Sequence, residues 1–391
     1  MDNNNETKID DEIDLDSVTD VSTTPQQIPG DPSTPISSPS PAIHKRAWRW
    51  TKNLSKKQKI ILGVVVLVFL GGACASAMWI LNKQAGPLPS ATTTAPPTKV
   101  QSHLTGLMIK PDDQDKQVTG VMIENSPDAR PQSGLIDAGV VYEAVAEGGI
   151  TRFLALFQDT ESKYLGPVRS VRPYYLDWLV PYDGAIAHVG GAPEALAQIK
   201  SQHIKDLDQF ANSGAYDRVT TRIMPHNVYT STKRLRQLEK QKKYNKSTFD
   251  GFTRHKKQRP LKTPKDRTIN ITQTGPLYDV VYKYDKRTNS YDRYLAGATH
   301  KDEKSGKQIS PKVVIAMEIN RTQNGVYSVY AVNGGGKVRV YQNGEMIIGK
   351  WKKKNRKSEI QLIDKDNNPI KLVPGKTWIT AVEPGHVTQK K

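Results

Sequence analysis

Residues 140–157, VVYEAVAEGGITRFLALF, place two apolar runs on either side of a Gly-Gly pair. Short apolar runs bounded by glycine are typical of buried strands, so we predict strands at 140–145 and 151–157. The same pattern predicts strands at 118–123 and 185–189. Helical patterns alternate with these strands, at 172–180, 193–201 and 231–243. Such alternation indicates an α/β domain, which we place at residues 104–240.

The C-terminal sequence has a different pattern, in which short apolar alternations are separated by Gly, Asn and Asp turns. Alternation of this kind predicts strands. We expect them at 280–284, 291–295, 313–319, 326–332, 337–341, 360–363 and 378–382. The sequence therefore indicates a β-rich C-terminal domain at 265–388, joined to the α/β domain by a basic linker at 241–264.

One segment, residues 60–81, IILGVVVLVFLGGACASAMWIL, holds no charged group. As a helix it spans about 33 Å, against a hydrocarbon core of about 30 Å. Seven Lys and Arg lie in residues 45–59, whereas only Lys83 and Lys99 follow in the next 20 residues. By the positive-inside rule we expect a single-pass transmembrane helix in the plasma membrane, with a cytoplasmic N-terminus and an extracellular folded part.

A cleaved or lipidated N-terminus is the alternative to an uncleaved helical anchor. The sequence before residue 60 is longer than the short basic region of a signal peptide. Lipid attachment at Cys74 would need Leu or a similar residue three positions earlier, where Gly71 stands. We also expect residues 1–59 to be a disordered tail ending in a basic juxtamembrane segment, and 82–103 to be a Pro- and Thr-rich stalk.

The formal net charge of +18 is concentrated toward the C-terminus, where residues 231–391 hold 36 basic and 14 acidic groups. A basic surface of this size favours polyanions such as nucleic acid, anionic lipid headgroups or phosphate-bearing wall polymers, or acts only as a solubilising field. The predicted extracellular location disfavours nucleic acid. With Cys74 as the single cysteine, no intrachain disulfide can form.

Three long runs resemble the YerB family of bacterial surface proteins: IENSPDARPQSGLIDAGVVYEAVAEGGITRFLALFQ (123–158), GPVRSVRPYYLDWLVPYDGAIAHVGGAPEAL (166–196) and PHNVY (225–229). The resemblance covers roughly 104–385. It implies an N-terminal and a C-terminal domain of unknown function, usually carried as a lipoprotein, and a location in the bacterial envelope. It implies no activity. The sequence departs from the lipoprotein pattern at Cys74, where a helical anchor would replace the lipid.

Several polar residues of the α/β domain are candidates for an anion or ligand pocket. Arg169 and Arg172 precede a predicted helix start, where guanidinium groups and free amides would favour phosphate or carboxylate. Glu147 and Arg152 flank the Gly-Gly pair and would form a buried ion pair, whereas a catalytic carboxylate pair would need Glu143 or Glu147 beside a second acid. The full set of candidates is Arg130, Glu147, Arg152, Arg169, Arg172, His188, Arg222, His226 and Asn227.

No residue set compels a reaction, and we favour a binding or scaffolding role over an enzyme. His188 and His226 lack the third ligand and the short spacing of a metal site, and no GxSxG, HExxH, Walker or GxGxxG context occurs, so we expect no metal and no cofactor. One enzymatic alternative is a loose similarity of arrangement to the LytR-CpsA-Psr phosphotransferases. In that case Arg130, Arg169 and Arg172 would hold a pyrophosphate, and Asp137 or Asp177 would assist the metal.

A second candidate site is the basic cluster GKWKKKNRK at 349–357. As a polyanion patch it would bind an anionic wall polymer or lipid headgroups through Trp351, Lys352, Lys353, Lys354, Arg356 and Lys357. The alternative is a solvated hairpin tip with Trp351 packed inward.

Overall fold

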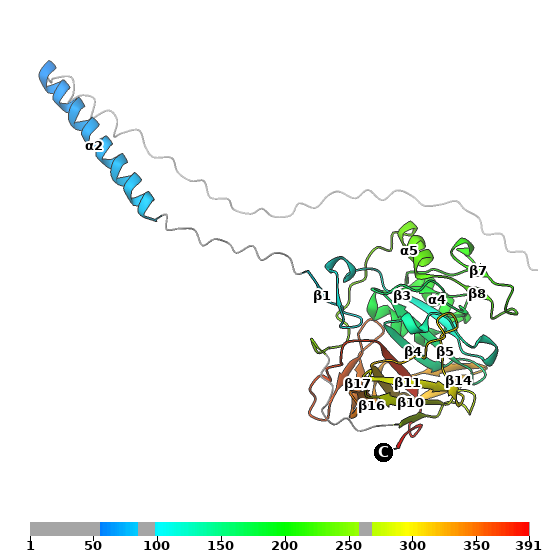
Figure 1. The fold of residues 1–391 in the computed structure, drawn as a ribbon. Helices are drawn as coiled ribbons and strands as arrows, with labels where there is room; N and C mark the ends of the chain where they lie inside the picture. Colours follow the sequence, from blue (N-terminus) through cyan, green and yellow to red (C-terminus); the bar gives the residue numbers. More distant parts are fainter. Residues whose placement is uncertain (1–54, 85–97, 258–267, 391) are drawn as a thin grey trace, which may run out of the picture. The chain divides into compact units, whose positions relative to one another are not determined.

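The computed structural model describes residues 55–84, 98–257 and 268–390 (Figure 1). The expected tail before residue 55 and most of the expected stalk lie outside these residues. The chain divides into two compact units, Met1–Thr93 and Thr94–Lys391, and the second is called the folded unit below.

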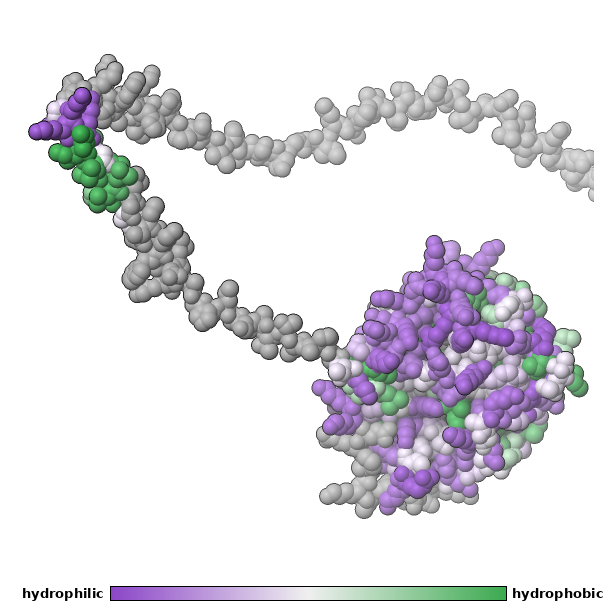
Figure 2. Space-filling view, turned by 45° about the horizontal axis from the view of Figure 1, so that its top comes forward, coloured by the Kyte–Doolittle hydropathy of each residue, from purple (hydrophilic) through white to green (hydrophobic). Residues whose placement is uncertain are grey.

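The first unit contains helix α2, Lys56–Gln84, which confirms the helical conformation expected for residues 60–81. Its described side chains are polar at the start of the helix and then apolar (Figure 2). Among the residues that the structure describes, no helix combines the length and the apolar character needed to cross a membrane. The membrane-spanning role of residues 60–81 is therefore not confirmed.

The folded unit is built on a nine-stranded mixed sheet with the order β18-β17-β16-β13-β19-β4-β5-β3-β6. Its strands are β3 Thr119–Glu124, β4 Val140–Val145, β5 Thr151–Phe157, β6 Ala185–Ala187, β13 Val313–Glu318, β16 Gly334–Gln342, β17 Glu345–Lys353, β18 Gln361–Ile363 and β19 Thr377–Val382. All four strands predicted for the α/β domain are present, β4 and β5 with the predicted bounds. The α/β region and the β-rich region are thus confirmed, and both contribute to this one sheet.

The two regions join where β4 pairs in parallel with β19, with Thr377 opposite Val140 and Thr380 opposite Glu143. Every residue of β3, β4, β5 and β19 is buried, as expected for strands covered on both faces. In Figure 1 the labelled strands of the C-terminal region lie below β4 and β5. The sequence pattern predicted eight of the nine strands, but neither β17 nor this shared sheet.

Two hydrophobic cores cover the two faces of the sheet. On one face Tyr142 and Leu154 pack with Trp178 of α3 and Ile199 of α4. The helices are α3 Pro173–Leu179, α4 Pro193–Ser201 and α5 Thr232–Gln241, close to the three predicted ranges. The proline at the first position of α3 and α4 costs no hydrogen bond there, because that amide has no intrahelical partner.

The second face packs against α5 and a five-stranded sheet of order β12-β11-β10-β9-β20. Its strands are β9 Thr268–Ile271, β10 Val280–Asp285, β11 Ser290–Leu295, β12 Ala298–Thr299 and β20 Val387–Lys390. Three two-stranded sheets complete the described structure: β1 Val100–Gln101 with β2 Met108–Ile109, β7 Asp217–Arg218 with β8 Val228–Tyr229, and β14 Arg321–Asn324 with β15 Tyr327–Tyr330. Short 3-10 helices occupy Pro111–Asp113, Pro127–Ala129, Leu135–Asp137, Val180–Tyr182 and Ser213–Ala215.

Parts of the expected stalk and linker belong to the folded unit. Ser102, within the expected stalk, is buried, and β1 lies just before it. In the expected linker, Phe249 and Phe252 join the first core, and the Ser247 hydroxyl accepts a hydrogen bond from Val118 N at 2.8 Å. The segment is rich in basic residues and was therefore predicted to be a linker, although its few apolar side chains pack into the core.

Candidate functional site

The predicted site residues of the α/β region gather at the edge of the sheet where the parallel strands β3 and β4 end and β5 begins. Glu124, the last residue of β3, lies opposite Arg152 of β5, and their side chains form an ion pair of 3.1 Å. Arg152 is fully buried, and its Nη2 also pairs with Glu147 at 2.7 Å. The ion pair expected between Glu147 and Arg152 is therefore present beside the turn at Gly148 and Gly149.

Two further arginines extend this cluster toward solvent. Arg169 Nε donates to Glu124 Oε2 at 2.7 Å, and Arg172 donates to both carboxylate oxygens of Glu147. Burial alone would raise the pKa of Glu124, but Arg152 and Arg169 outweigh it and hold that pKa at about 2. The pKa of Glu147 is lowered in the same way, against its burial, by Arg152 and Arg172. Both carboxylates are ionised near neutral pH and hold arginines in place.

Arg130 differs from Arg152, Arg169 and Arg172 because no carboxylate pairs with it among the described residues. Its Nε and Nη2 donate to the side-chain and backbone oxygens of Asn125, at 3.1 and 2.8 Å. The guanidinium carbon lies 5.2 Å from the ring centre of Tyr278, which belongs to the C-terminal region. Burial lowers the pKa of Arg130, although a guanidinium remains charged at neutral pH. Its cationic group is thus positioned without a counter-charge of its own.

The loop between β7 and β8 brings Arg222 and His226 to the same place. Arg222 donates to the backbone oxygens of Asp128 and Pro131 at 2.9 and 2.8 Å, which fixes the loop over the segment that carries Arg130. His226 Nδ1 lies 3.4 Å from the Ser126 hydroxyl. Burial lowers the pKa of His226; Glu124 and Asp128 oppose this shift, and Arg169 and Arg222 add to it. We call Arg130, Arg169, Arg172, Arg222 and His226 the arginine site.

His188 and Asn227 do not direct their side chains into this site. The buried ring of His188 bonds to the Gly190 carbonyl at 2.7 Å and to Asp206 at 3.0 Å. Asn227 accepts a hydrogen bond from Arg218 at 3.2 Å. An active site would bring all the candidate residues together, and only some of them meet here.

Of the residues named for the phosphotransferase alternative, the three arginines lie in the arginine site, whereas Asp177 has a partner elsewhere. Asp177, five residues after Arg172, forms an ion pair with Arg356 of the segment at 349–357. The guanidinium of Arg172 donates hydrogen bonds to Glu147 and to the carbonyl oxygen of the preceding residue, Val171. Among the residues described, no three His, Cys, Asp or Glu side chains are grouped so as to hold a metal ion.

The second candidate, at 349–357, is only partly a surface patch. Trp351 is 1 % exposed and donates to Glu318 O at 2.9 Å, so it packs inward, as the alternative interpretation expected. Lys353 is 1 % exposed and donates to the carbonyl of Arg356 at 2.9 Å. Arg356 is bound to Asp177, Gln198 and Gln202. Lys352, Lys354 and Lys357 remain as exposed cations. Most of this segment forms strand β17, which the sequence analysis did not predict.

Comparisons with known proteins agree with the resemblance in the sequence. Residues 104–245 match the N-terminal domain, and 268–379 the C-terminal domain, of the DUF3048 family of proteins of unknown function. The chain is 31% identical to a Bacillus subtilis (strain 168) protein named "Putative lipoprotein YerB" over 292 residues, which is 73% of this chain and 86% of that protein. The crystal structure of Bacillus subtilis YerB matches with a TM-score of 0.68 and 30% identity, over 75% of this chain and 100% of the crystallised chain. The chain belongs to the DUF3048 family.

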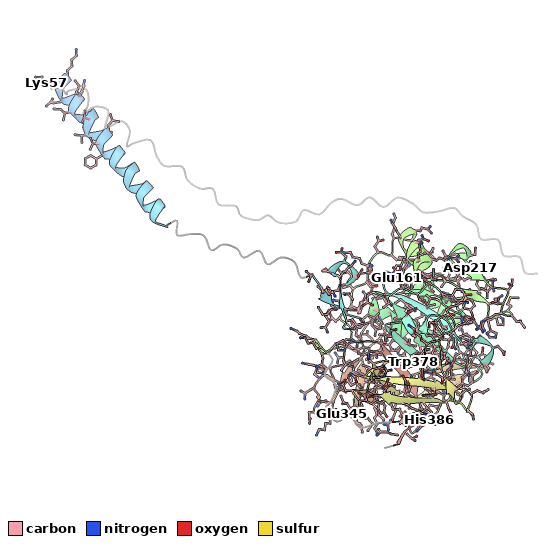
Figure 3. All side chains as sticks on the ribbon, in the orientation of Figure 1. Lys57, Glu161, Asp217, Glu345, Trp378 and His386 are labelled. Carbon is pink, nitrogen blue, oxygen red and sulfur yellow. The ribbon has the colours of Figure 1, made fainter. Side chains whose placement is uncertain are left out.

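The two DUF3048 domains are locked together by a buried polar network that the sequence analysis missed. Glu143 of the N-terminal domain accepts hydrogen bonds from Arg293 at 2.8 and 2.9 Å and from Trp378 at 2.8 Å. Arg293 also contacts His300, which bonds to Gln132 at 2.9 Å. In Figure 3 Trp378 lies in the middle of the folded unit, whereas Glu345 and His386 lie near its lower edge.

The same network also contacts the residues that hold Arg130 in the arginine site. Gln132 donates to Asn125 Oδ1 at 2.8 Å, and the same oxygen accepts from Arg130. Arg130 is therefore positioned by a chain of side-chain contacts that runs from Glu143 through Arg293, His300, Gln132 and Asn125. The carboxylate of Glu143, a candidate for a catalytic carboxylate pair, is fully buried and bonds to this network. A cavity of about 220 Å³ also lies at the domain junction, beside Val141, Pro311 and Trp378, and none of the predicted site residues lines it.

Proposed function

We propose that this DUF3048 protein is held in the bacterial envelope by its N-terminal part and binds an anionic envelope polymer through the arginine site. The observation that carries the proposal is the state of Arg130, a charged guanidinium with no carboxylate partner among the described residues. Its Nη1 makes no hydrogen bond there, and Arg169 uses only Nε, leaving two terminal nitrogens for a ligand. Guanidinium groups bind phosphate oxygens in this way.

The charge of the chain is consistent with a phosphate-bearing polymer. The net charge of +18 would draw a polyanion toward the folded unit, and the exposed Lys352, Lys354 and Lys357 add a second, weaker contact surface. Glu124 already holds Arg169, and Asn125 already holds Arg130, so little side-chain entropy would be lost on binding.

Binding is tested with poly(glycerol phosphate) as the probe and neutral dextran as the control polymer. The full chain with Arg130→Gln and Arg169→Gln is expected to bind the polyphosphate at least ten-fold more weakly than the unchanged chain. Its dependence of log affinity on log salt concentration is expected to flatten by about 0.7 to 0.9 per lost phosphate contact. Arg287→Gln, at a side chain that is 84% exposed, is the matched control and should change neither value. Equal affinity of all three proteins would refute the proposal.

We also propose that α2 anchors the chain in the plasma membrane as a single span with a cytoplasmic N-terminus. The support is the uncharged run at 60–81 and the seven basic residues before it. The relative named as a lipoprotein is consistent with an envelope location, and here a helix would replace the lipid. The full chain should stay in the membrane fraction through alkaline extraction, and deletion of 60–81 should release it. Retention of a Cys74→Ala variant separates a helical anchor from a lipid, and a protease that digests the folded unit of intact protoplasts tests the orientation.

A further inference from the structure

The surface around the arginine site combines positive charge with exposed apolar side chains. Eleven large apolar residues of the folded unit are exposed, and five of them lie on, or directly beside, three loops that contact this site. They are Ile223, Met224, Leu277, Val326 and Tyr327. Figure 2 shows hydrophobic residues at the right-hand edge of the folded unit, the side on which Figure 1 places β7, β8 and β14. We call these five residues the apolar rim.

Specific contacts tie each of the three loops to the arginines. Ile223 and Met224, exposed by 86% and 68%, directly follow Arg222, whose guanidinium is fixed on the segment that carries Arg130. Leu277, exposed by 55%, precedes the Tyr278 ring beneath Arg130. The position of these side chains is therefore set by the same contacts that position the charge.

The third loop contacts the ion-pair cluster at Arg172 and at the turn that follows Glu147. The Tyr327 ring centre lies 5.2 Å from the guanidinium carbon of Arg172, and Val326 O accepts a hydrogen bond from Gly148 N at 3.4 Å. The neighbouring Gly149 O accepts from Thr274, in the loop that also carries Leu277. Loops from both DUF3048 domains thus surround the arginines.

From this arrangement we propose that the arginine site takes an amphiphilic anion, a phosphate ester with a hydrocarbon chain, with the phosphate on Arg130 and Arg169 and the chain on the apolar rim. This inference rests on the proposed anion binding and adds the class of ligand. A purely polar polyphosphate would leave the rim in water, and an uncharged lipid would leave Arg130 without a counter-charge. Exposed apolar residues beside fixed charge fit a ligand that has both parts.

The test uses a series of alkyl phosphates below their micelle concentrations, with the fragment Thr94–Lys391. This fragment is a compact unit with its own cores, and 75% of the present chain matches the whole of the crystallised YerB chain. Each methylene withdrawn from water should tighten binding about four-fold. We therefore expect octyl phosphate to bind at least ten-fold more tightly than methyl phosphate.

Variants separate the two parts of the ligand. Ile223→Ser with Leu277→Ser should reduce the gain from chain length and preserve the affinity for methyl phosphate. Ile348→Ser removes an apolar side chain that is 49% exposed on β17, outside the three loops, and is the matched control. Octyl and methyl phosphate binding equally would overturn the inference and leave anion binding intact. Binding of neither phosphate would overturn both proposals.

Discussion

Glu143 and Arg293 form an ion pair between the two DUF3048 domains, and neither side chain is exposed to solvent. One guanidinium nitrogen lies 2.8 and 2.9 Å from the two carboxylate oxygens, and the indole of Trp378 donates to the same carboxylate at 2.8 Å. Removing one partner of a buried pair leaves an uncompensated charge in a low dielectric, which costs more than the intact pair contributes.

This relationship predicts a large loss of stability in either single variant. Arg293→Met or Glu143→Gln should lower the free energy of unfolding by about 3 to 5 kcal/mol. Because the pair joins the two domains, both should unfold in one transition in the unchanged protein, measured by urea denaturation followed by circular dichroism and tryptophan fluorescence. Arg287→Met, at an exposed ion pair of 3.5 Å, is the control and should cost less than about 1 kcal/mol. A loss of similar size in the control and in Arg293→Met would contradict the prediction.

Glu239 of α5 gives the folded unit a pH-dependent stability. The carboxyl is 2% exposed, and burial raises its pKa from 4.5 to about 7, against the opposing hydrogen bond from the Thr119 hydroxyl. A folded-state pKa above the unfolded one means that the folded protein binds the extra proton. Protonation of Glu239 therefore stabilises the folded unit by about 3 kcal/mol below pH 4.5. This stabilisation is lost as the pH rises through 7.

The matching experiment compares Glu239→Gln with the unchanged chain in urea titrations between pH 4.5 and 8. The variant mimics the protonated carboxyl, so its stability should fall less over this range. Glu194→Gln on the exposed face of α4 should keep the original slope. Parallel slopes for Glu239→Gln and the unchanged protein would show that the carboxyl titrates normally.

The sequence predicted elements better than it predicted their partners. The apolar runs at 140–145 and 151–157 are strands with those bounds, because a strand covered on both faces must be apolar at every position. No local pattern indicates that β4 pairs with β19, more than 230 residues later, since strand pairing over long separations leaves no periodic signal. The single sheet across both domains was therefore missed.

The candidate site was predicted in part for a similar reason. Arg169, Arg172 and Arg152 were found because they flank strand ends and glycines, where loops meet at the edge of an α/β sheet. Glu124 was missed, although it is the central acceptor of the cluster, because one acid at the end of an apolar strand gives no distinctive pattern. The role of Glu124 follows from its position opposite Arg152, and that position is set by the pairing of β3 with β5.

Gly349 of β17 is predicted to be intolerant of any side chain. A Cβ there would lie 2.1 Å from the carbonyl oxygen of Ile363, in the neighbouring strand β18. Gly349→Ala must therefore push β17 and β18 apart, and we expect a loss of about 2 to 4 kcal/mol in the free energy of unfolding. Gly214→Ala, where a Cβ would meet nothing within 4 Å, is the control and should change stability by less than about 0.5 kcal/mol. Thermal melts that coincide for both variants would contradict this prediction.

Lys353 should behave unlike the lysines on either side of it in sequence. Its ammonium group donates to the carbonyl oxygens of Asn355 and Arg356 and lies 3.4 Å from Asn333 Oδ1, and burial lowers its pKa to about 8. Lys353→Met would leave these acceptors without a donor, so we expect a loss of about 1 to 3 kcal/mol in stability.

Lys352→Met and Lys354→Met, at exposed side chains, should each change stability by less than about 0.5 kcal/mol. The comparison also decides how the basic segment is tested for polymer binding. A charge reversal that includes Lys353 would weaken binding by unfolding the turn at residues 354–357, whereas reversal of Lys352, Lys354 and Lys357 alone reports on surface charge. Equal melting temperatures for Lys353→Met and Lys352→Met would show that the buried ammonium is not a structural donor.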